Sequence, residues 1–182
     1  ASMTGLTCNT TYHYRAYAAN TSGTSTGSDV TFTTSPCAPT VVTSAASSVT
    51  MSTVTLNGSI SATGGANATQ SGFAYGTSAS LSTTIATSSL GAQTGTASFN
   101  EAISGLTPST TYYFRAYATN SAGTSTGSIL SFTTSAPGVP TVTTQSASSI
   151  TATTATGNGN ITSTGGVNAT VRGVAYGLTT AY

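Results

Sequence analysis

The stretch Leu106-Thr-Pro-Ser-Thr-Thr-Tyr-Tyr-Phe-Arg-Ala-Tyr-Ala-Thr-Asn120 decides the fold of this chain. From Tyr112 onward, side chains alternate between two faces, with Tyr112, Phe114, Ala116 and Ala118 on one and Tyr113, Arg115 and Tyr117 on the other. A period of two residues predicts a β-strand with one buried face. We expect a loop over Asn120–Gly127 to reverse the chain into a second strand over Ser128–Thr134, where Leu130 and Phe132 pack.

This predicted hairpin belongs to a long internal repeat. Gly5–Ser35 and Gly105–Ser135 are identical at 21 of 31 positions, and Pro39–Thr77 returns as Pro140–Leu178 with 23 of 39 identities. The offsets of 100 and 101 residues are typical of whole β-domains, because solenoid repeats are only about 20–50 residues long. We expect three segments: residues 1–36 as the C-terminal hairpin of a partial repeat, 37–136 as a complete repeat, and 137–182 as the N-terminal part of a third.

The rest of the complete repeat also reads as short strands between clusters of Gly, Asn and Ser, with no helical period. The predicted strands lie near Thr40–Thr43, Thr53–Ala62, Ser71–Thr77 and Ala97–Ile103, with a short edge strand within Leu81–Leu90. The expected inward side chains are Val54, Leu56, Ile60, Phe73, Tyr75, Phe99 and Ile103. Alternation also points Glu101 inward, which is costly for a carboxylate. The sequence predicts an all-β sandwich and leaves the Glu101 conflict open.

Two motifs resemble a known family. Tyr112 before the penultimate strand, with Asn120-Ser-Ala-Gly123 after it, resembles the end of a fibronectin type III domain, whose tyrosine corner ties this strand to the upstream turn. Tyr12 takes that position in the first copy. Gly72-Phe-Ala-Tyr-Gly76 and Gly173-Val-Ala-Tyr-Gly177 look like the fibronectin-III-like repeats of large bacterial surface and secreted proteins. The resemblance implies tandem immunoglobulin-like β-sandwich domains of about 101 residues, used for spacing or adhesion. The absence of Trp is a departure, because such domains commonly bury one.

The third copy carries smaller side chains at core positions. Ala155 and Gly157 replace Val54 and Leu56, and Val174 replaces Phe73. Each lost large side chain removes roughly 1.5–3 kcal/mol of burial. We expect this segment alone not to close a core.

Composition restricts the partners. Arg15, Arg115, Arg172, Asp29 and Glu101 are the chain's only fixed charges, for a net charge of +1, so no basic patch exists for nucleic acid. Ser and Thr make up 72 of the 182 residues, a composition that favours an extracellular or cell-surface location. No apolar run approaches the roughly 18–20 residues that span a bilayer. The expected partners are copies of the chain or neighbouring repeats, and surface glycans or polysaccharide.

The two cysteines flank the first predicted hairpin. Cys8 precedes its first strand and Cys37 follows its second, so both fall at the open end, near disulfide distance. The second copy has Pro108 and Ala136-Pro137-Gly138 there, so both cysteines are lost together, as expected of a pair. A bridge would imply an oxidising compartment, and two free thiols are the alternative. With His13 as the sole histidine, we expect no metal site and no cofactor.

Asn-x-Ser/Thr sequons offer candidate glycosylation sites. They occur at Asn9, Asn20, Asn57, Asn67, Asn160 and Asn168. A chain this rich in Ser and Thr also produces such sequons by chance.

Catalysis is not expected. His13 and Asp29 with abundant Ser suggest a hydrolase, but the second copy has Tyr113 and Ile129 at those positions. No Gly-x-Ser-x-Gly elbow is present, and Asp29 and Glu101, the acidic residues, belong to different repeats. The sequence therefore predicts a protein that is not an enzyme.

The outward stripe of Tyr113, Arg115 and Tyr117, with Arg15 and Tyr17 in the first copy, is the best surface candidate. Aromatic rings beside a guanidinium can anchor a protein or a sugar. Ordinary cross-strand packing on an outer sheet face is the alternative. The Gly-rich Asn120–Gly127 segment joins two strands, so it lacks the helix N-terminus of a phosphate site.

These observations favour a structural and adhesive tandem repeat of an extracellular fibre or long surface protein. The two incomplete repeats are complementary, so head-to-tail strand pairing could build a filament, although an arbitrary cut in a longer polypeptide explains them more simply. The runner-up is a spacer or carbohydrate-binding module of a secreted polysaccharide-degrading enzyme. A phage or pilus tip fibre shares the same fold prediction.

Overall fold

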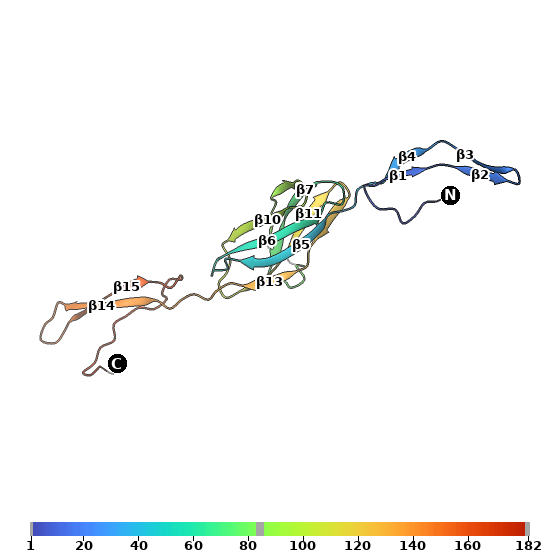
Figure 1. The fold of residues 1–182 in the computed structure, drawn as a ribbon. Coiled ribbons are helices and arrows are strands. Elements are labelled where there is room, and N and C mark those ends of the chain that lie inside the picture. Colours follow the sequence, from blue (N-terminus) through green and yellow to red (C-terminus); the bar gives the residue numbers. More distant parts are fainter. Residues whose placement is uncertain (1, 83–85, 181–182) are drawn as a thin grey trace. The chain divides into compact units, whose positions relative to one another are not determined.

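The computed structural model describes residues 2–82 and 86–180 and forms two compact units, Ala1–Thr134 and Ser135–Tyr182. All regular elements of the described residues are β-strands (Figure 1). The first unit holds β1 (Thr11–Tyr14), β2 (Tyr17–Asn20), β3 (Gly23–Thr26), β4 (Val30–Thr33), β5 (Thr40–Ser47), β6 (Thr53–Ala62), β7 (Ala68–Gly76), β8 (Ala86–Thr87), β9 (Gly91–Gln93), β10 (Ser98–Ser104), β11 (Thr111–Asn120), β12 (Gly123–Thr126) and β13 (Leu130–Thr133). The second holds β14 (Thr141–Ser148) and β15 (Thr156–Ser163).

Strands β5 to β13 form a two-layer sandwich (Figure 1). One layer is the antiparallel sheet β10–β6–β5. In the other, β11 pairs with β7 on one side and with β12 and β13 on the other, while the short strands β8 and β9 cover the far edge of β7. This is an immunoglobulin-like, fibronectin-type-III-like β-sandwich, as the sequence predicts.

Alternation along the strands builds the core between the layers. In β6, Val54, Leu56 and Ile60 are buried, and β11 contributes Tyr112, Phe114, Ala116 and Ala118. Phe73 packs against Phe99 with ring centroids 5.3 Å apart. Gly58 lies on β6 and faces β11 in the other layer. A Cβ on Gly58 would be 2.7 Å from the Cβ of Ala116. The core therefore closes around Phe, Tyr and Leu in a chain without Trp.

The strands predicted from the sequence are present, and they differ from the predictions in where they begin and end. The strand predicted over Thr53–Ala62 is observed over that range. The one expected at Thr40–Thr43 continues to Ser47, and the one expected at Ala97–Ile103 lies one residue later. The edge segment within Leu81–Leu90 holds β8, although residues 83–85 of that prediction lie outside the described residues.

The loop expected over Asn120–Gly127 is a correction. Its residues form a tight turn followed by β12, which pairs with the end of β11. The Asn120 carboxamide oxygen accepts hydrogen bonds from the backbone N–H groups of Ala122 and Gly123, at 2.8 and 3.2 Å. Gly123 has a φ of 144°, which favours glycine. A composition rich in Gly, Ser and Thr is typical of a loop. Here the hydrogen bonds of Asn120 complete the turn within two residues, so the following residues can form β12.

Residues 11–33 repeat the hairpin without a sandwich around it. Strands β1 and β4 pair with Tyr12 opposite Phe32, and β2 pairs with β3. Tyr12 and Tyr14 contact Phe32 with ring centroids 5.8 and 6.0 Å apart, close to the 5.6 and 5.9 Å of Tyr112 and Phe114 to Phe132. Here, however, Tyr14 is 45 % exposed, whereas Phe114 is fully buried. The local geometry is retained although this face of the hairpin is open.

The second unit consists of the β14–β15 hairpin and the segment that follows it. Its register repeats that of β5–β6, with Val142 opposite Ile161 as Val41 is opposite Ile60. Within the described part of this unit, no residue is buried. A hairpin alone cannot cover its own apolar face, as expected for this segment.

Candidate interaction surface

The outward stripe Tyr113–Arg115–Tyr117 lies on β11 beside the small residues of β7. Tyr113 is opposite Gly76, Arg115 opposite Ala74, and Tyr117 opposite Gly72. All three stripe residues are half-buried, while Ala74 and the two glycines are buried. The Nε atom of Arg115 is buried without a hydrogen-bond partner among the described residues. The stripe is therefore a partly buried surface that lies beside small, buried residues of β7.

Tyr117 has a structural partner. Its hydroxyl donates to the backbone carbonyl of Ser88 at 2.6 Å. A Cβ on Gly72 would lie 2.1 Å from that carbonyl oxygen and 3.1 Å from Cε1 of Tyr117. Tyr117 thus spans Gly72 and holds the β8–β9 segment, an arrangement that fits cross-strand packing. A contact role for Tyr117 stays a prediction.

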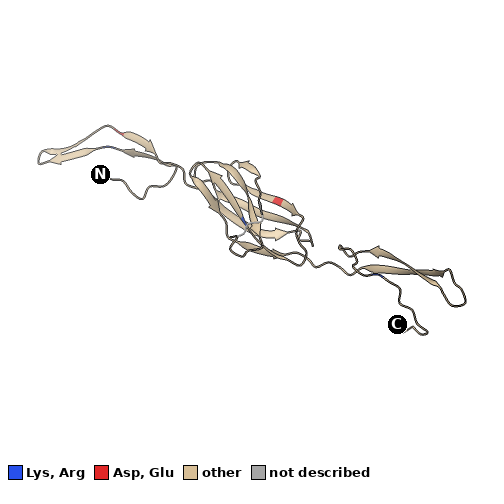
Figure 2. Ribbon diagram, turned by 180° about the vertical axis from the view of Figure 1, so that it is seen from behind, with Lys and Arg blue, Asp and Glu red and all other residues tan. Residues whose placement is uncertain are grey.

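The same stripe is open in the first hairpin. Tyr17 is 77 % exposed and Arg15 is exposed. Among the described residues, no strand pairs with β1 or β2 on the side where β11 has β7. Basic side chains are few in the described part of the chain, and all of them are Arg (Figure 2). Any contact made by Tyr17 and Arg15 would therefore rely on aromatic area and one guanidinium.

Glu101 points into the sandwich in a regular strand. It lies opposite Leu56, on the face of β10 that carries Phe99 and Ile103, so no bulge turns it out. It is half-buried, and its Oε2 atom is buried without a hydrogen-bond partner among the described residues. Burial raises the pKa of the nearby Tyr75 hydroxyl, and the charges of Glu101 and Tyr112 raise it further. Glu101 therefore points inward as alternation predicts, with the desolvation cost of a partly buried carboxylate.

Tyr112 and Tyr12 both adopt the tyrosine-corner geometry. The Tyr112 hydroxyl accepts from the Thr107 backbone N–H at 3.0 Å, and the Tyr12 hydroxyl accepts from the Thr7 backbone N–H at 2.8 Å. The latter hydrogen bond lowers the pKa of Tyr12. Each hydroxyl ties the strand to the turn five residues upstream.

Thr43 and Asn120 are structural polar residues whose hydrogen bonds sequence reasoning did not predict. The Thr43 hydroxyl accepts from the Ala116 backbone N–H at 3.0 Å, across the layers and at the break between β12 and β13. Asn120 donates to the carbonyls of Cys37 and Thr63, at 2.8 and 3.0 Å. A signal for both exists in the repeat itself, because Thr144 and Asn20 take the equivalent positions.

Cys8 and Cys37 form a disulfide, with Cα atoms 5.7 Å apart. The described residues contain no free cysteine. Cys37 is exposed and Cys8 is half-buried. The bond closes a loop of the first unit at the base of the β1–β4 hairpin.

The sequons differ in the freedom of their asparagine side chains. Asn57 donates to the Ala45 carbonyl at 2.8 Å and to the Ser47 hydroxyl at 3.1 Å. Asn20 and Asn67 accept backbone hydrogen bonds through Oδ1, which leaves the amide nitrogen out of those bonds. The remaining sequon asparagines are exposed: Asn9, Asn160 and Asn168. Glycosylation of any of them stays a prediction.

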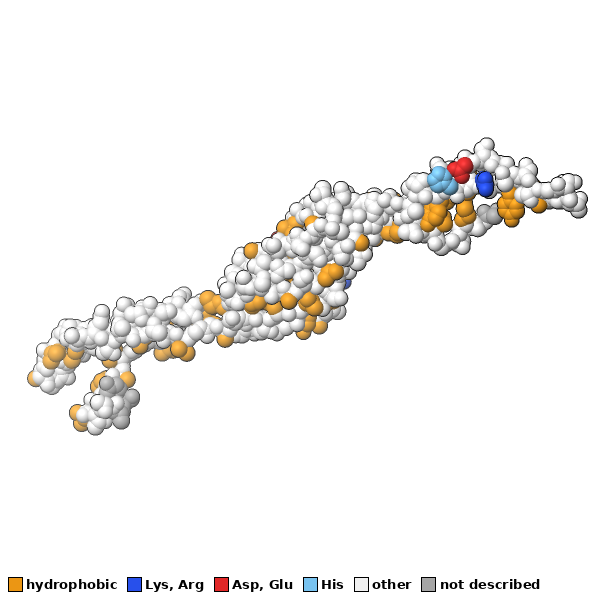
Figure 3. All heavy atoms as spheres, viewed as in Figure 1, with side chains coloured by type: hydrophobic (Ala, Val, Ile, Leu, Met, Phe, Trp, Pro, Cys, Tyr) orange, Lys and Arg blue, Asp and Glu red, His pale blue; other side chains and the backbone are white. Residues whose placement is uncertain are grey.

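His13 and Asp29 form an exposed hydrogen-bonded pair. His13 Nδ1 lies 2.7 Å from Asp29 Oδ2, and the two side chains are 67 % and 55 % exposed. Figure 3 shows a His side chain and an acidic side chain together on the surface of the N-terminal hairpin region. Among the hydrogen bonds of the described residues, none joins either side chain to a serine. This pair lacks the nucleophile and the enclosure of a catalytic dyad.

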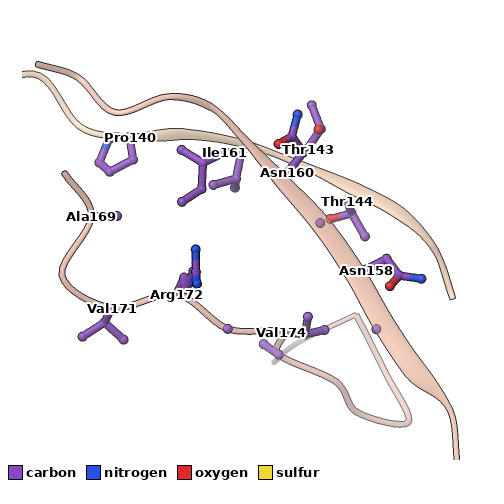
Figure 4. A pocket seen from close by; sticks show the side chains of 15 residues that line it. Pro140, Thr143, Thr144, Asn158, Asn160, Ile161, Ala169, Val171, Arg172 and Val174 are labelled. Atoms are coloured by element: carbon purple, nitrogen blue, oxygen red, sulfur yellow. The ribbon is translucent and has the colours of Figure 1, made fainter. Parts of the chain in front are cut away.

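The second unit contains a groove of about 660 Å³ between the β14–β15 hairpin and residues 169–175. In Figure 4, Ile161, Val171 and Val174 lie along it, with Arg172 on the same segment. Gly159 also lines it and corresponds to Gly58, which meets Ala116 in the complete repeat. The groove therefore includes the position that is equivalent to a core glycine of β6.

Among solved structures, the chain is similar at low sequence identity to two proteins, with the following values. The sensor domain of the anti-sigma factor RsgI4 from Pseudobacteroides cellulosolvens is 19 % identical over 54 % of this chain and 95 % of its own, with a TM-score of 0.45. The FN1–FN3 domains of chicken CNTN1 are 17 % identical over 72 % of this chain and 45 % of theirs, with a TM-score of 0.44. No protein family and no curated protein matches the sequence.

The described residues contain neither a membrane-spanning helix nor a cluster of metal ligands. No helix in that part of the chain is long and apolar enough to cross a bilayer. No group of three or more His, Cys, Asp or Glu side chains gathers there in a way that could hold a metal ion.

Proposed function

We propose that this chain is a non-enzymatic structural and adhesive tandem repeat of an extracellular fibre or long bacterial surface protein. The near-duplication of the sequence, at offsets of 100 and 101 residues, is the observation that carries this proposal. Each sandwich acts as a spacer, and weak contacts along the array add through avidity. Localisation outside the cell is supported by the Cys8–Cys37 disulfide.

The surface chemistry supports such a role. Hydroxyl pairs take the place of ion pairs between neighbouring strands, as in Thr111–Thr133 at 2.9 Å and Thr119–Thr124 at 2.7 Å. Such pairs keep the surface wet without charge, at a modest contribution of about 0.2–1 kcal/mol each. A surface with few charges has little defence against association, which suits a fibre.

The proposal includes strand pairing between repeats. The Tyr12–Tyr14–Phe32 face of the first hairpin and the groove of the second unit match the two halves of one sandwich interior. We propose that strands of a neighbouring repeat cover both, in the same polypeptide or in another copy, head to tail.

The mass of the native polypeptide tests the tandem array. Under reducing, denaturing conditions and after deglycosylation, we expect a mass far above 17.8 kDa, together with further copies of the repeat in peptide sequencing. A small native protein without further repeats, or a single domain with a saturable small-molecule affinity, would contradict the proposal.

Sedimentation velocity tests pairing between copies. We expect the 182-residue chain to form concentration-dependent oligomers. Tyr14→Arg places a charge on the apolar face and should abolish them, whereas Tyr17→Arg on the opposite face should not. A monomer at all concentrations would confine the pairing to one polypeptide.

The alternative function is a non-catalytic carbohydrate-binding or spacer module of a secreted polysaccharide-degrading enzyme. The half-buried Tyr113–Arg115 part of the stripe favours it. Affinity electrophoresis on immobilised polysaccharide should then show retardation that Tyr113→Ala removes. Tyr113 is the sharper probe, because Tyr117→Ala also removes the hydrogen bond to Ser88. Absence of retardation on a panel of polysaccharides argues against this alternative.

A further inference from the structure

Cys37 belongs to the sandwich by its backbone hydrogen bonds. Its N–H donates to the Gly64 carbonyl at 2.9 Å, and its own carbonyl accepts from Asn120 Nδ2 at 2.8 Å. These partners lie in the turn after β6 and at the end of β11, so they anchor Cys37 to both layers. Hydrogen bonds of both its N–H and its C=O group therefore hold the backbone of Cys37 on the complete repeat.

The hairpin of the preceding repeat ends only two residues earlier. The Asn9 N–H donates to the Ser35 carbonyl at 3.1 Å, and the Thr34 N–H donates to the Thr10 carbonyl at 3.0 Å. Pro36 is the single residue between the last carbonyl of the hairpin and the first N–H of the sandwich. Its ring restricts φ to about −65°. The linker between these two repeats is therefore short and has one fixed torsion.

The disulfide crosses this boundary. Cys8 precedes β1 on the hairpin side, and its sulfur is bonded to Cys37 on the sandwich side. Beside it, a Cβ added to Gly65 would lie 2.1 Å from the Cβ of Asn9, so the Gly64-Gly65 turn touches the base of the hairpin directly. The two repeats are thus joined by Pro36, by a covalent bridge and by a close contact.

The next junction in the chain lacks the bridge. Its linker enters the second unit through the same hydrogen bond, from the Gly138 N–H to the Gly165 carbonyl at 2.8 Å. Pro108 and Gly138 stand where the first junction has cysteines, and Ala136 and Pro137 replace the single Pro36. One junction is therefore short and covalently bridged, and the other is longer by one residue and unbridged.

We propose that Cys8–Cys37 is an inter-repeat clamp that makes one junction stiff, while junctions of the Pro108/Gly138 type act as hinges. Reduction of the clamp converts a stiff junction into a flexible one. In that step a dithiol reductant gives up two electrons and two protons and becomes a cyclic disulfide, and Cys8 and Cys37 become thiols. The exposed position of Cys37 gives the reductant access. This inference concerns the mechanics of the chain and stands whether the array serves adhesion or spacing.

Residual dipolar couplings of backbone amides in the 182-residue chain test the clamp. In the oxidised chain, we expect the couplings of β1–β4 and of β5–β13 to fit one alignment tensor. After reduction with dithiothreitol, or in the double variant Cys8→Ser with Cys37→Ser, the hairpin couplings should fall at least twofold while those within the sandwich stay unchanged. The couplings of β14–β15 should be reduced relative to the sandwich in both states, as expected of a hinge.

Nuclear Overhauser contacts between Tyr12 and Phe32 distinguish a free hairpin from an unfolded one. Persistence of these contacts after reduction, together with reduced couplings, supports the clamp. Loss of the contacts would mean that the disulfide holds the hairpin itself and overturns the proposal. A single alignment tensor that survives reduction, or separate tensors already in the oxidised chain, overturns it as well.

Discussion

Residues 11–20 and 111–120 have nearly the same sequence, with seven of ten residues identical, but they form different strands. Strand β11 runs without interruption from Thr111 to Asn120, whereas the first copy breaks into β1 and β2 around Arg15 and Ala16. The equivalent residues of β11, Arg115 and Ala116, lie opposite the gap between β12 and β13, and β7 pairs with both of them on the other side. In the first copy, no strand of the described residues takes the place of β7.

The same contrast occurs at the other end of the repeat. Gly72–Gly76 forms the end of β7 against β11, while Gly173–Gly177 of the second unit, which differs at one position, forms no strand. Alternation and glycine placement are therefore not sufficient for a strand. The hydrogen-bonding edge of a neighbouring strand decides whether a short segment of this type forms a strand.

The largest effect should come from removing a core ring in one copy and its equivalent in the other. Phe114→Ala should destabilise the sandwich by about 3–5 kcal/mol, because the ring is fully buried. Tyr14→Ala at the equivalent position should leave the sandwich unchanged, because that side chain is 45 % exposed outside it. Urea unfolding followed through the amide NMR signals of β6 and β11 separates the regions. Equal losses would show that the hairpin contributes to the same cooperative core.

A matched pair of glycines gives the next effect. Gly72→Ala places a Cβ 2.1 Å from the Ser88 carbonyl oxygen, so β8 must shift, at a cost of about 1–3 kcal/mol. Gly173→Ala has no atom within 4 Å of the new Cβ and should be neutral. Hydrogen exchange at Phe73 and Ser88 reads out the shift. Unchanged protection there would mean that Tyr117 and the β8–β9 segment adapt without loss.

A smaller effect is expected at the inter-layer hydrogen bond. Thr43→Val removes the acceptor of the buried Ala116 N–H and should cost about 1–2 kcal/mol. Thr144→Val in the second unit is the matched variant. It should change no stability, because Thr144 is exposed and lines the open groove. The measurement is the urea midpoint of the sandwich, and an unchanged midpoint for Thr43→Val would show that Ala116 finds another acceptor.

Sequence reasoning predicted burial correctly where the period of a strand alone decides which side chains face the core. Val54, Leu56 and Phe73 are buried as alternation predicts, because a half-buried strand imposes a period of two. It failed at the β11–β12 turn, where Asn120 bonds to Ala122 and Gly123 inside a stretch with loop-like composition.

The hydrogen-bond partners at the candidate surface were harder to predict from the sequence. The hydroxyl of Tyr117 meets Ser88, a residue from a segment with weak periodicity, so its partner could not be read from β11 alone. The roles of Thr43 and Asn120 also depend on residues more than 50 positions away in the sequence. Only their recurrence as Thr144 and Asn20 could have marked them in advance.

The smallest expected effect is a pH dependence confined to the complete repeat. The pKa of Tyr75 is raised first by burial and then by the charges of Glu101 and Tyr112, so the folded state holds the phenolic proton more tightly than the unfolded chain. Stability from this group is therefore complete below about pH 10 and is lost as the pH rises through the folded-state pKa.

Tyr75→Phe should flatten that alkaline decline, whereas Tyr176→Phe, at a side chain that is 91 % exposed in the second unit, should leave it unchanged. Urea midpoints measured at several pH values on both sides of pH 10, together with an ultraviolet titration of tyrosinate, check both statements. Equal slopes in the parent chain and in Tyr75→Phe would assign the decline to other tyrosines. The difference between the two copies would then lie in packing alone and not in the ionisation of the half-buried Tyr75.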